Sequence, residues 1–143
     1  MKLDARVAPD PTRVSDGRIL QIHVDPRLPH LVILEVDHMD RQVQVYDTRA
    51  AGFKQAPALE FGCRDNNTKF KSRYVKGTTS RSFFARPYAD DGKGVVCIWD
   101  YRKTKEAMFR LVREAPIVHT ALIGSNVVAY GGHLVTIWDT KTS

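Results

Sequence analysis

The chain has 143 residues, of which 43% are hydrophobic and 27% charged, a composition typical of one globular domain with its own core. No apolar run approaches the length of about 20 residues that a membrane span needs, and the first residues lack the apolar stretch of a signal peptide. The two cysteines, Cys63 and Cys97, are too few for a disulfide scaffold and lack the spacing of zinc ligands. We therefore expect a cytoplasmic or nuclear protein.

The net charge of +6 is concentrated in one segment. Between Arg64 and Arg86 the sequence has seven basic residues and one acidic residue, whereas the rest of the chain has as many acidic as basic residues. Local asymmetry of this kind indicates the nature of a partner better than the overall charge does. We call residues 64–86 the basic segment.

The first 18 residues are polar and contain turn-forming residues, and we expect a lead-in segment in which residues 3–7 could add a short edge strand. Residues 19–49 then contain β-branched and apolar runs separated by turn residues, which is typical of a β-meander. The strands expected in this first unit cover residues 19–24, 31–36 and 42–46.

Residues 50–71 form a long excursion with glycine, asparagine and lysine, which we interpret as an insertion that carries part of the basic segment. The strand pattern returns in residues 72–113, and we expect residues 88–94 to form a polar turn within this second unit. Its expected strands cover residues 72–79, 82–85, 95–99 and 107–112. Residues 103–113 have a composition that suits a helix, but their position favours turn and strand.

The third unit comprises residues 114–143 and is more compact than the other two. Turns are expected at residues 124–126 and 131–132, because glycine, serine and asparagine gather there. The expected strands cover residues 117–123, 127–130 and 134–138. We expect the outer strand of this unit to be missing from the chain.

Three strands end in the same way, with an aromatic residue, then aspartate and, two positions later, a basic residue. The copies are Tyr46-Asp47 with Arg49, Trp99-Asp100 with Arg102, and Trp138-Asp139 with Lys141. Asp139 lies 39 residues after Asp100, close to the period of about 40–45 residues found in propeller blades. Asp100 lies 53 residues after Asp47, and the excess falls in the excursion at residues 50–71.

With these endings the chain resembles the WD-repeat family, whose members form β-propellers of four-stranded blades. The resemblance covers about residues 19–143 and implies an all-β fold, an incomplete propeller of about three four-stranded antiparallel blades. The resemblance also implies a structural role in the blades for seven residues: Asp40, Tyr46, Asp47, Trp99, Asp100, Trp138 and Asp139. A closed propeller needs at least four blades, so the remaining blades would come from a longer chain, a second copy or a partner.

The repeats are divergent. Members of the family usually carry an aspartate in the tight turn six residues before the aromatic residue, in a hydrogen-bonded network with histidine and serine or threonine. Asp40 occupies this place before Tyr46, whereas Lys93 and Gly132 occupy it before the two tryptophans. The first unit therefore matches the family pattern best.

The aromatic–aspartate–x–arginine ending also resembles the box found in substrate receptors of cullin-RING ubiquitin ligases. That resemblance implies that Arg49 and Arg102 contact the ligase adaptor, since an arginine side chain binds carbonyl and carboxylate groups through two parallel hydrogen bonds. The alternative is that basic residues simply follow the aromatic–aspartate pair at the solvated end of each blade.

The basic segment supplies the partner-binding residues that we would select from sequence. Basic residues interleaved with aromatic ones can bind an acidic protein, or can bind a nucleic-acid backbone and stack its bases. A third interpretation is that the basic residues form a solvated surface. The selected residues are Lys69, Lys71, Arg73, Tyr74, Arg81, Arg86 and Tyr88.

No arrangement of nucleophile, base and orienting group can be read from the sequence, and we expect a protein that is not an enzyme and has no cofactor. His23, His30 and His38 lie without metal-ligand spacing, so no metal site is expected. The pattern favours a non-catalytic WD-repeat scaffold that mediates protein–protein interaction within a multiprotein assembly. Nucleic-acid binding through the basic segment and a ubiquitin-ligase substrate receptor are the alternatives.

Overall fold

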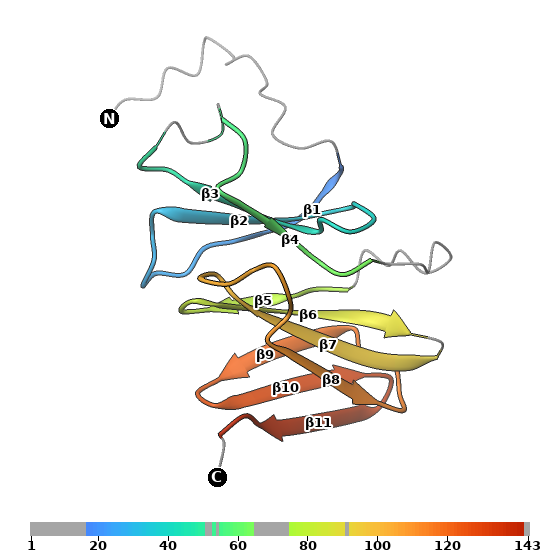
Figure 1. Ribbon diagram of the computed structural model, residues 1–143. Helices are drawn as coiled ribbons and strands as arrows, with labels where there is room; N and C mark the ends of the chain where they lie inside the picture. Colours follow the sequence, from blue (N-terminus) through green and yellow to red (C-terminus); the bar gives the residue numbers. More distant parts are fainter. Residues whose placement is uncertain (1–16, 51–52, 54, 65–74, 91, 142–143) are drawn as a thin grey trace, which may run out of the picture.

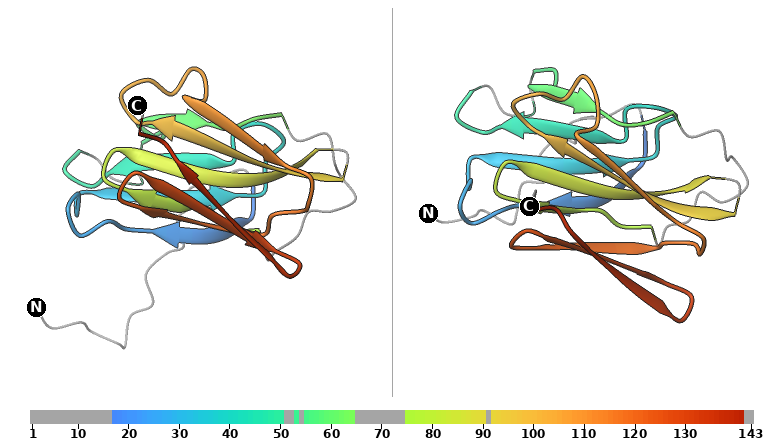
Figure 2. Two further views of the ribbon diagram at one scale, coloured as in Figure 1. Left: turned by 90° about the horizontal axis from the view of Figure 1, so that it is seen from below. Right: turned by 60° about the horizontal axis from the view of Figure 1, so that its bottom comes forward.

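The computed structural model describes residues 17–50, 53, 55–64, 75–90 and 92–141 (Figure 1). Its regular structure is β throughout, arranged in three antiparallel sheets of three or four strands. The sheets lie one above another in chain order, which Figure 2 shows from two further directions. No helix formed by the described residues has the length and apolarity that crossing a membrane requires.

The first sheet has the strand order β1-β2-β3-β4. Its strands are β1 (Ile19–His23), β2 (Leu31–Val36), β3 (Val43–Asp47) and β4 (Leu59–Phe61). The first three follow the expected meander. Strand β4 lies inside residues 50–71, where we expected an insertion, and pairs with β3 through Val43 with Phe61 and Val45 with Leu59. The alternation of apolar and polar residues in β4 spans only three residues, which is too short to be recognised in the sequence.

The second sheet has the order β5-β6-β7-β8. Its strands are β5 (Thr78–Ser80), β6 (Phe83–Asp90), β7 (Lys93–Asp100) and β8 (Phe109–Arg113). The polar turn expected over residues 88–94 is wrong in extent, because Tyr88 pairs with Val95 and Asp90 with Lys93. The reversal needs only the two residues between β6 and β7, and Gly92 adopts the positive φ of 82° that such a short hairpin turn requires.

The third sheet has the order β11-β10-β9, and the described residues add no fourth strand to it. Its strands are β9 (His119–Ile123), β10 (Asn126–Gly131) and β11 (Leu134–Asp139). They follow the expected pattern, with tight turns between successive strands. On the side away from the second sheet, Ile123, Val135 and Ile137 are exposed, by 61%, 67% and 63%. Such a contiguous exposed apolar face is unusual for a free surface.

Two apolar clusters fill the spaces between the sheets. The first joins the first and second sheets and includes Phe61, Phe84 and Trp99, with the rings of Phe61 and Trp99 5.1 Å apart. The second joins the second and third sheets and includes Ile98 and Val127. Successive residues of β7 therefore alternate between the two clusters, which is why its sequence is apolar on both faces.

The aromatic residue that closes each repeat lies on the same side of its sheet. Trp99 faces the first sheet and is 1% exposed, and Trp138 packs against the cluster beneath the second sheet. Tyr46 lies on the face of the first sheet that points away from the second, where it is buried against Phe53 at a ring distance of 4.8 Å. The repeated sequence ending thus corresponds to a repeated position in the fold.

Candidate interaction site

The loops that follow β1, β3, β5, β7, β9 and β11 gather at one end of the stack, on the left in Figure 1. Within each sheet the neighbouring strands are antiparallel, so alternate strands end on the same side. The loops and strand ends there carry Asp25, Asp47, Asp100 and Asp139. We call this the aspartate end.

At the aspartate end, the aspartate–x–arginine motif forms a closed local turn. Asp47 accepts hydrogen bonds from the backbone N–H and the guanidinium of Arg49, and Asp100 does the same with Arg102. The shortest contact between guanidinium and carboxylate is 2.9 Å in the first pair and 2.6 Å in the second. The bonded guanidinium of Arg49 lowers the pKa of Asp47 to about 2, and that of Arg102 lowers the pKa of Asp100.

The third copy differs. Asp139 accepts a hydrogen bond from the backbone N–H of Lys141 at 2.9 Å and one from the hydroxyl of Ser125 at 3.2 Å. Its aspartate therefore keeps the turn-forming role without the bidentate ion pair. In all three repeats the acidic residue terminates the strand by capping a backbone N–H two residues later.

A fourth motif of the same spacing, Asp25-Pro26-Arg27, was not selected from sequence. Asp25 is 5% exposed and accepts hydrogen bonds from the backbone N–H of Arg27 at 2.9 Å and that of Arg81 at 2.7 Å. These bonds hold the pKa of Asp25 below its ordinary value, and the bond from the backbone of Arg27 has the largest effect. Asp25 thereby ties the β1–β2 loop of the first sheet to the β5–β6 turn of the second. The shared spacing with Asp47 and Asp100 was the signal that could have found it.

Arg81 occupies the β5–β6 turn in a left-handed conformation, with φ of 55°. A residue other than glycine pays roughly 1–2 kcal/mol for this conformation, and the bond from its N–H to buried Asp25 helps to hold it. The Arg81 side chain is exposed, and no described residue forms a hydrogen bond or ion pair with its guanidinium. The turn therefore presents a free cation at the aspartate end.

Beside Arg81 a cavity of about 200 Å³ opens between the second and third sheets. Its apolar lining comes from Phe83, Ile98, Met108, Phe109, Leu122 and Val127, and its polar lining from Arg27, Ser80, Arg81, Ser125, Asn126 and Thr140. Met108 is 45% exposed. The cavity can therefore accept an apolar side chain while Arg81 offers positive charge to a neighbouring acidic group. The guanidinium of Arg27 is already bound, because it donates to Asp25 at 3.2 Å and to the Ser80 hydroxyl at 3.3 Å.

Of the other partner-binding residues selected from sequence, Lys69, Lys71, Arg73 and Tyr74 lie outside the described residues. Arg86 and Tyr88 lie in the interior, at 7% and 8% exposure, and offer little surface to a partner. Successive side chains of β6 point in opposite directions, and Arg86 and Tyr88 are on the face towards the first sheet, while their neighbours point towards the third. The charge pattern of the sequence does not reveal which face a residue occupies. Arg81 remains the exposed member of the set among the described residues.

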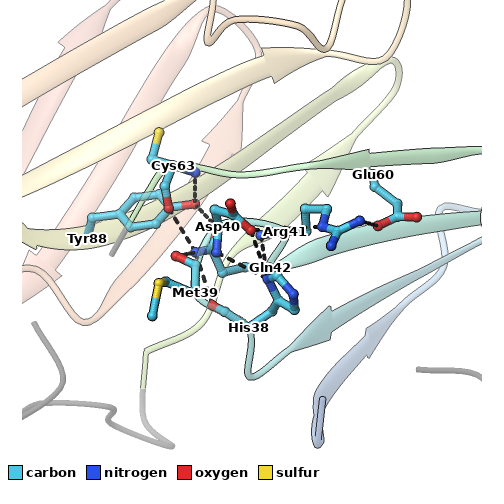
Figure 3. Close-up of polar contacts among 8 residues, drawn as sticks. All are labelled: His38, Met39, Asp40, Arg41, Gln42, Glu60, Cys63 and Tyr88. Carbon is cyan, nitrogen blue, oxygen red and sulfur yellow. Dashed lines mark hydrogen bonds and ion pairs between the residues drawn. The ribbon is translucent and has the colours of Figure 1, made fainter. Parts of the chain in front are cut away.

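Tyr88 belongs to a hydrogen-bonded network at the opposite end of the stack (Figure 3). Its hydroxyl donates to Gln42 Oε1 at 2.9 Å and accepts from the backbone N–H of Cys63 at 3.2 Å. Gln42 in turn donates to the carbonyl of Cys63 at 2.8 Å. Burial raises the pKa of Tyr88, so the hydroxyl stays protonated as this network requires.

Asp40 lies in the same turn but has a smaller part than the family resemblance implies. Its Oδ1 is 3.0 Å from Nδ1 of His38, and its side chain is 56% exposed. Gln42, two residues later, makes the buried contacts that join this turn to Cys63 and Tyr88. Sequence reasoning missed Gln42, because a glutamine between Arg41 and Val43 at the start of a strand carries no pattern.

Comparison with known proteins shows the fold but no family. No protein-family model matches the chain, and no curated protein matches it. Among solved structures it is similar to Hsv2 of Kluyveromyces lactis, a propeller protein, with a TM-score of 0.55 and 13% sequence identity. The match covers 88% of this chain and 34% of Hsv2, so the chain spans about a third of the length of that protein.

Proposed function

We propose that the chain is part of a WD-repeat β-propeller that acts as a non-catalytic scaffold for protein–protein interaction. The observation that carries this proposal is the stack of antiparallel sheets in which Tyr46, Trp99 and Trp138 occupy the same side of successive sheets. The likeness to Hsv2 supports the architecture. Rigid stacked sheets that present loops at one end are suited to holding partners in place.

The propeller that we propose has further blades, supplied by a longer chain, a second copy or a partner. The apolar outer face of the third sheet supports this, because its exposed Val135 and Ile137 precede Trp138 as the buried Val96 and Ile98 precede Trp99. Among the described residues no strand pairs with the free edge of β11. An uncovered edge and face of this kind favour association with another sheet.

The binding site that we propose is the cavity at the aspartate end, and its partner is an acidic protein segment. Arg81 would meet the acidic side chain, and an apolar side chain would enter beside Met108. Arginine is enriched among the residues that contribute most to protein interfaces. Carboxylates also match the two parallel N–H groups of a guanidinium.

Two alternatives make different predictions. A nucleic-acid partner would bind through the basic segment, and its affinity would fall log-linearly with salt, at a slope near −0.7 to −0.9 per phosphate contact. A ubiquitin-ligase receptor would depend on Arg49 and Arg102, whose guanidinium groups here bind Asp47 and Asp100. Arg49→Ala and Arg102→Ala would then abolish adaptor pulldown while Arg81→Glu leaves it intact.

The test uses a fluorescein-labelled peptide of alternating glutamate and leucine residues, titrated with the full chain and followed by fluorescence anisotropy. We expect Arg81→Glu to weaken binding about tenfold or more, since it replaces a favourable charge at the cavity by a repulsive one. Lys93→Glu is the matched control, because Lys93 is an exposed cation at the opposite end of β7. Equal losses in both variants, or tighter binding of a labelled single-stranded oligonucleotide than of the peptide, would contradict the proposed site.

A further inference from the structure

The two cysteines of the chain lie against each other across the interface between the first and second sheets. Cys63 follows β4 and Cys97 lies in β7, and their Sγ atoms are 3.3 Å apart, with both thiols free. They are 34 residues apart in sequence, so only the stacking of the sheets brings them together. Their spacing in the sequence gave no indication of this contact.

We propose that Cys63 and Cys97 form a redox site, in which a peroxide converts the two thiols into a reversible disulfide that links the first sheet to the second. The proposal does not depend on the identity of the scaffold's partner. It rests on the position of the two sulfur atoms, their unequal exposure and the cations around them.

The backbone of Cys63 is held on both sides, which keeps its sulfur beside the second sheet. Its N–H donates to the Tyr88 hydroxyl at 3.2 Å and its carbonyl accepts from Gln42 Nε2 at 2.8 Å (Figure 3). Tyr88 belongs to β6, directly beside the strand that carries Cys97. A disulfide needs the sulfur atoms to approach to about 2 Å, and a small side-chain rotation on this fixed backbone reduces the distance.

The two thiols have different roles because their environments differ. Cys63 is partly exposed, whereas Cys97 is 2% exposed. The hydrogen bond between the two thiols lowers the pKa of Cys63 to about 7, and the positive charges of Arg110 and Arg86 add to this. The same bond, together with burial, raises the pKa of Cys97. Cys63 is therefore the accessible thiolate, and Cys97 is the resolving thiol that holds the shared proton.

The reaction balances with peroxide as the oxidant. The Cys63 thiolate attacks one peroxide oxygen, the O–O bond breaks, and the product is a Cys63 sulfenic acid and hydroxide, which takes up a proton to become water. The Cys97 sulfur then attacks the Cys63 sulfur and displaces hydroxide, which leaves as water with the Cys97 proton. In sum, two thiols and one hydrogen peroxide give one disulfide and two waters. A dithiol such as dithiothreitol reverses the step by exchange.

The test treats the reduced full chain with hydrogen peroxide, removes the oxidant with catalase, blocks free thiols with N-ethylmaleimide and measures the intact mass. We expect the wild type to lose the mass of two hydrogen atoms, to take up no maleimide, and to regain both thiols with dithiothreitol. Peptide mapping of the oxidised wild type should recover one linked peptide that contains Cys63 and Cys97. This measurement needs no variant and is independent of any folding defect.

The single variants separate the two roles. Cys97→Ser should accumulate a sulfenic acid at Cys63 that dimedone traps, and Cys63→Ser should react with peroxide about tenfold more slowly, because only the buried thiol remains. Alkylation of Cys63 should be half-maximal near pH 7 in the wild type and at a higher pH in Cys97→Ala, whose methyl group cannot replace the hydrogen bond between the two sulfur atoms. Disulfides only between chains, oxidation beyond the sulfenic acid without a link, or equal rates for both variants would overturn the proposal.

Discussion

At the scale of single residues, the interior contains a charged pair between the first two sheets. Glu35 is fully buried and Arg86 is 7% exposed, with Arg86 Nε 3.6 Å from Glu35 Oε2. The other carboxylate oxygen of Glu35 accepts hydrogen bonds from the backbone N–H of Gly77 at 2.6 Å and from His23 at 2.9 Å. The Arg86 guanidinium also lies 4.6 Å above the ring of Tyr88. The pair joins β2 to β6, and His23 adds β1 to the contacts of the buried carboxylate. Arg86 supplies the counter-charge that apolar contacts alone would not provide.

We expect Arg86→Ala to lower the free energy of unfolding by about 3–5 kcal/mol, because it leaves the buried Glu35 carboxylate without its cation. Urea unfolding followed by tryptophan fluorescence measures the change. Arg102→Ala is the control, since its ion pair with Asp100 is exposed to solvent and should contribute little to stability. A loss for Arg86→Ala as small as that of the control would show that Glu35 is stabilised by Gly77 and His23 alone.

The turn at Asp47 makes a prediction about pH. The pKa of Asp47 is lowered from its ordinary value of 3.8 to about 2 by the hydrogen bond from Arg49. The ion pair therefore stabilises the folded chain at pH values above the ordinary pKa of 3.8, and this stabilisation is lost as the pH falls towards 2. In Arg49→Ala the pKa of Asp47, followed by NMR of its carboxyl carbon, should rise towards the ordinary value, while the backbone N–H of residue 49 keeps part of the lowering. An unchanged midpoint would mean that the backbone N–H of residue 49 alone lowers the pKa.

At the scale of structural elements, the contact between the β1–β2 loop and the β5–β6 turn depends on one carboxylate. Asp25 is buried and accepts the backbone N–H groups of Arg27 and Arg81, so it positions the turn that carries the free guanidinium of the proposed binding site. Asp139, which ends β11, is exposed, and its hydrogen bonds from Ser125 and Lys141 do not reach another sheet. Similar sequence motifs therefore contribute differently to the stability of the fold in different sheets.

We expect Asp25→Ala to lower the free energy of unfolding by about 1–3 kcal/mol, because it leaves buried N–H groups without acceptors. It should also weaken binding of the acidic peptide, since the Arg81 turn loses its anchor. Asp139→Ala is the matched control and should change stability by no more than about 1 kcal/mol. If both variants lose the same stability, the link between the two sheets is not carried by Asp25.

At the scale of the whole molecule, the stack is asymmetric. Both faces of the second sheet are covered by neighbours, whereas the third sheet exposes an apolar outer face and the free edge of β11. A propeller gains stability when each blade covers the next, and the uncovered face is where a further blade would pack. The exposed face therefore governs how the chain behaves when it is isolated.

We expect the isolated chain to self-associate through this face, because exposed Val135 and Ile137 lie side by side with Tyr130 and Val128 across the β10–β11 pair. The double variant Val135→Lys and Ile137→Lys should shift the native mass, measured by light scattering behind a sizing column, towards that of a monomer. Met39→Lys, which changes an exposed apolar residue of the β2–β3 turn, is the control. Association that persists in the double variant and is lost in the control would place the interface elsewhere.

The sequence by itself determined the features that depend on local pattern. Period-two alternation and turn residues placed most of the strands, and the repeated aromatic–aspartate endings indicated three similar units, because both signals arise within a few residues. The charge pattern selected Arg81 only as a member of the basic segment, and the structure places it in the turn between β5 and β6. Sequence reasoning overlooked β4, whose three residues are too few to show alternation.

Only the tertiary structure decided which face of each strand meets another sheet. The burial of Arg86 and Tyr88, the contact between Cys63 and Cys97, and the role of Asp25 all depend on the stacking of one sheet on the next. Charge and spacing along the chain do not carry that information, since residues on opposite faces of a strand are adjacent in sequence. The contacts that join sheets are non-local, and their partners are selected by the packing of the whole stack.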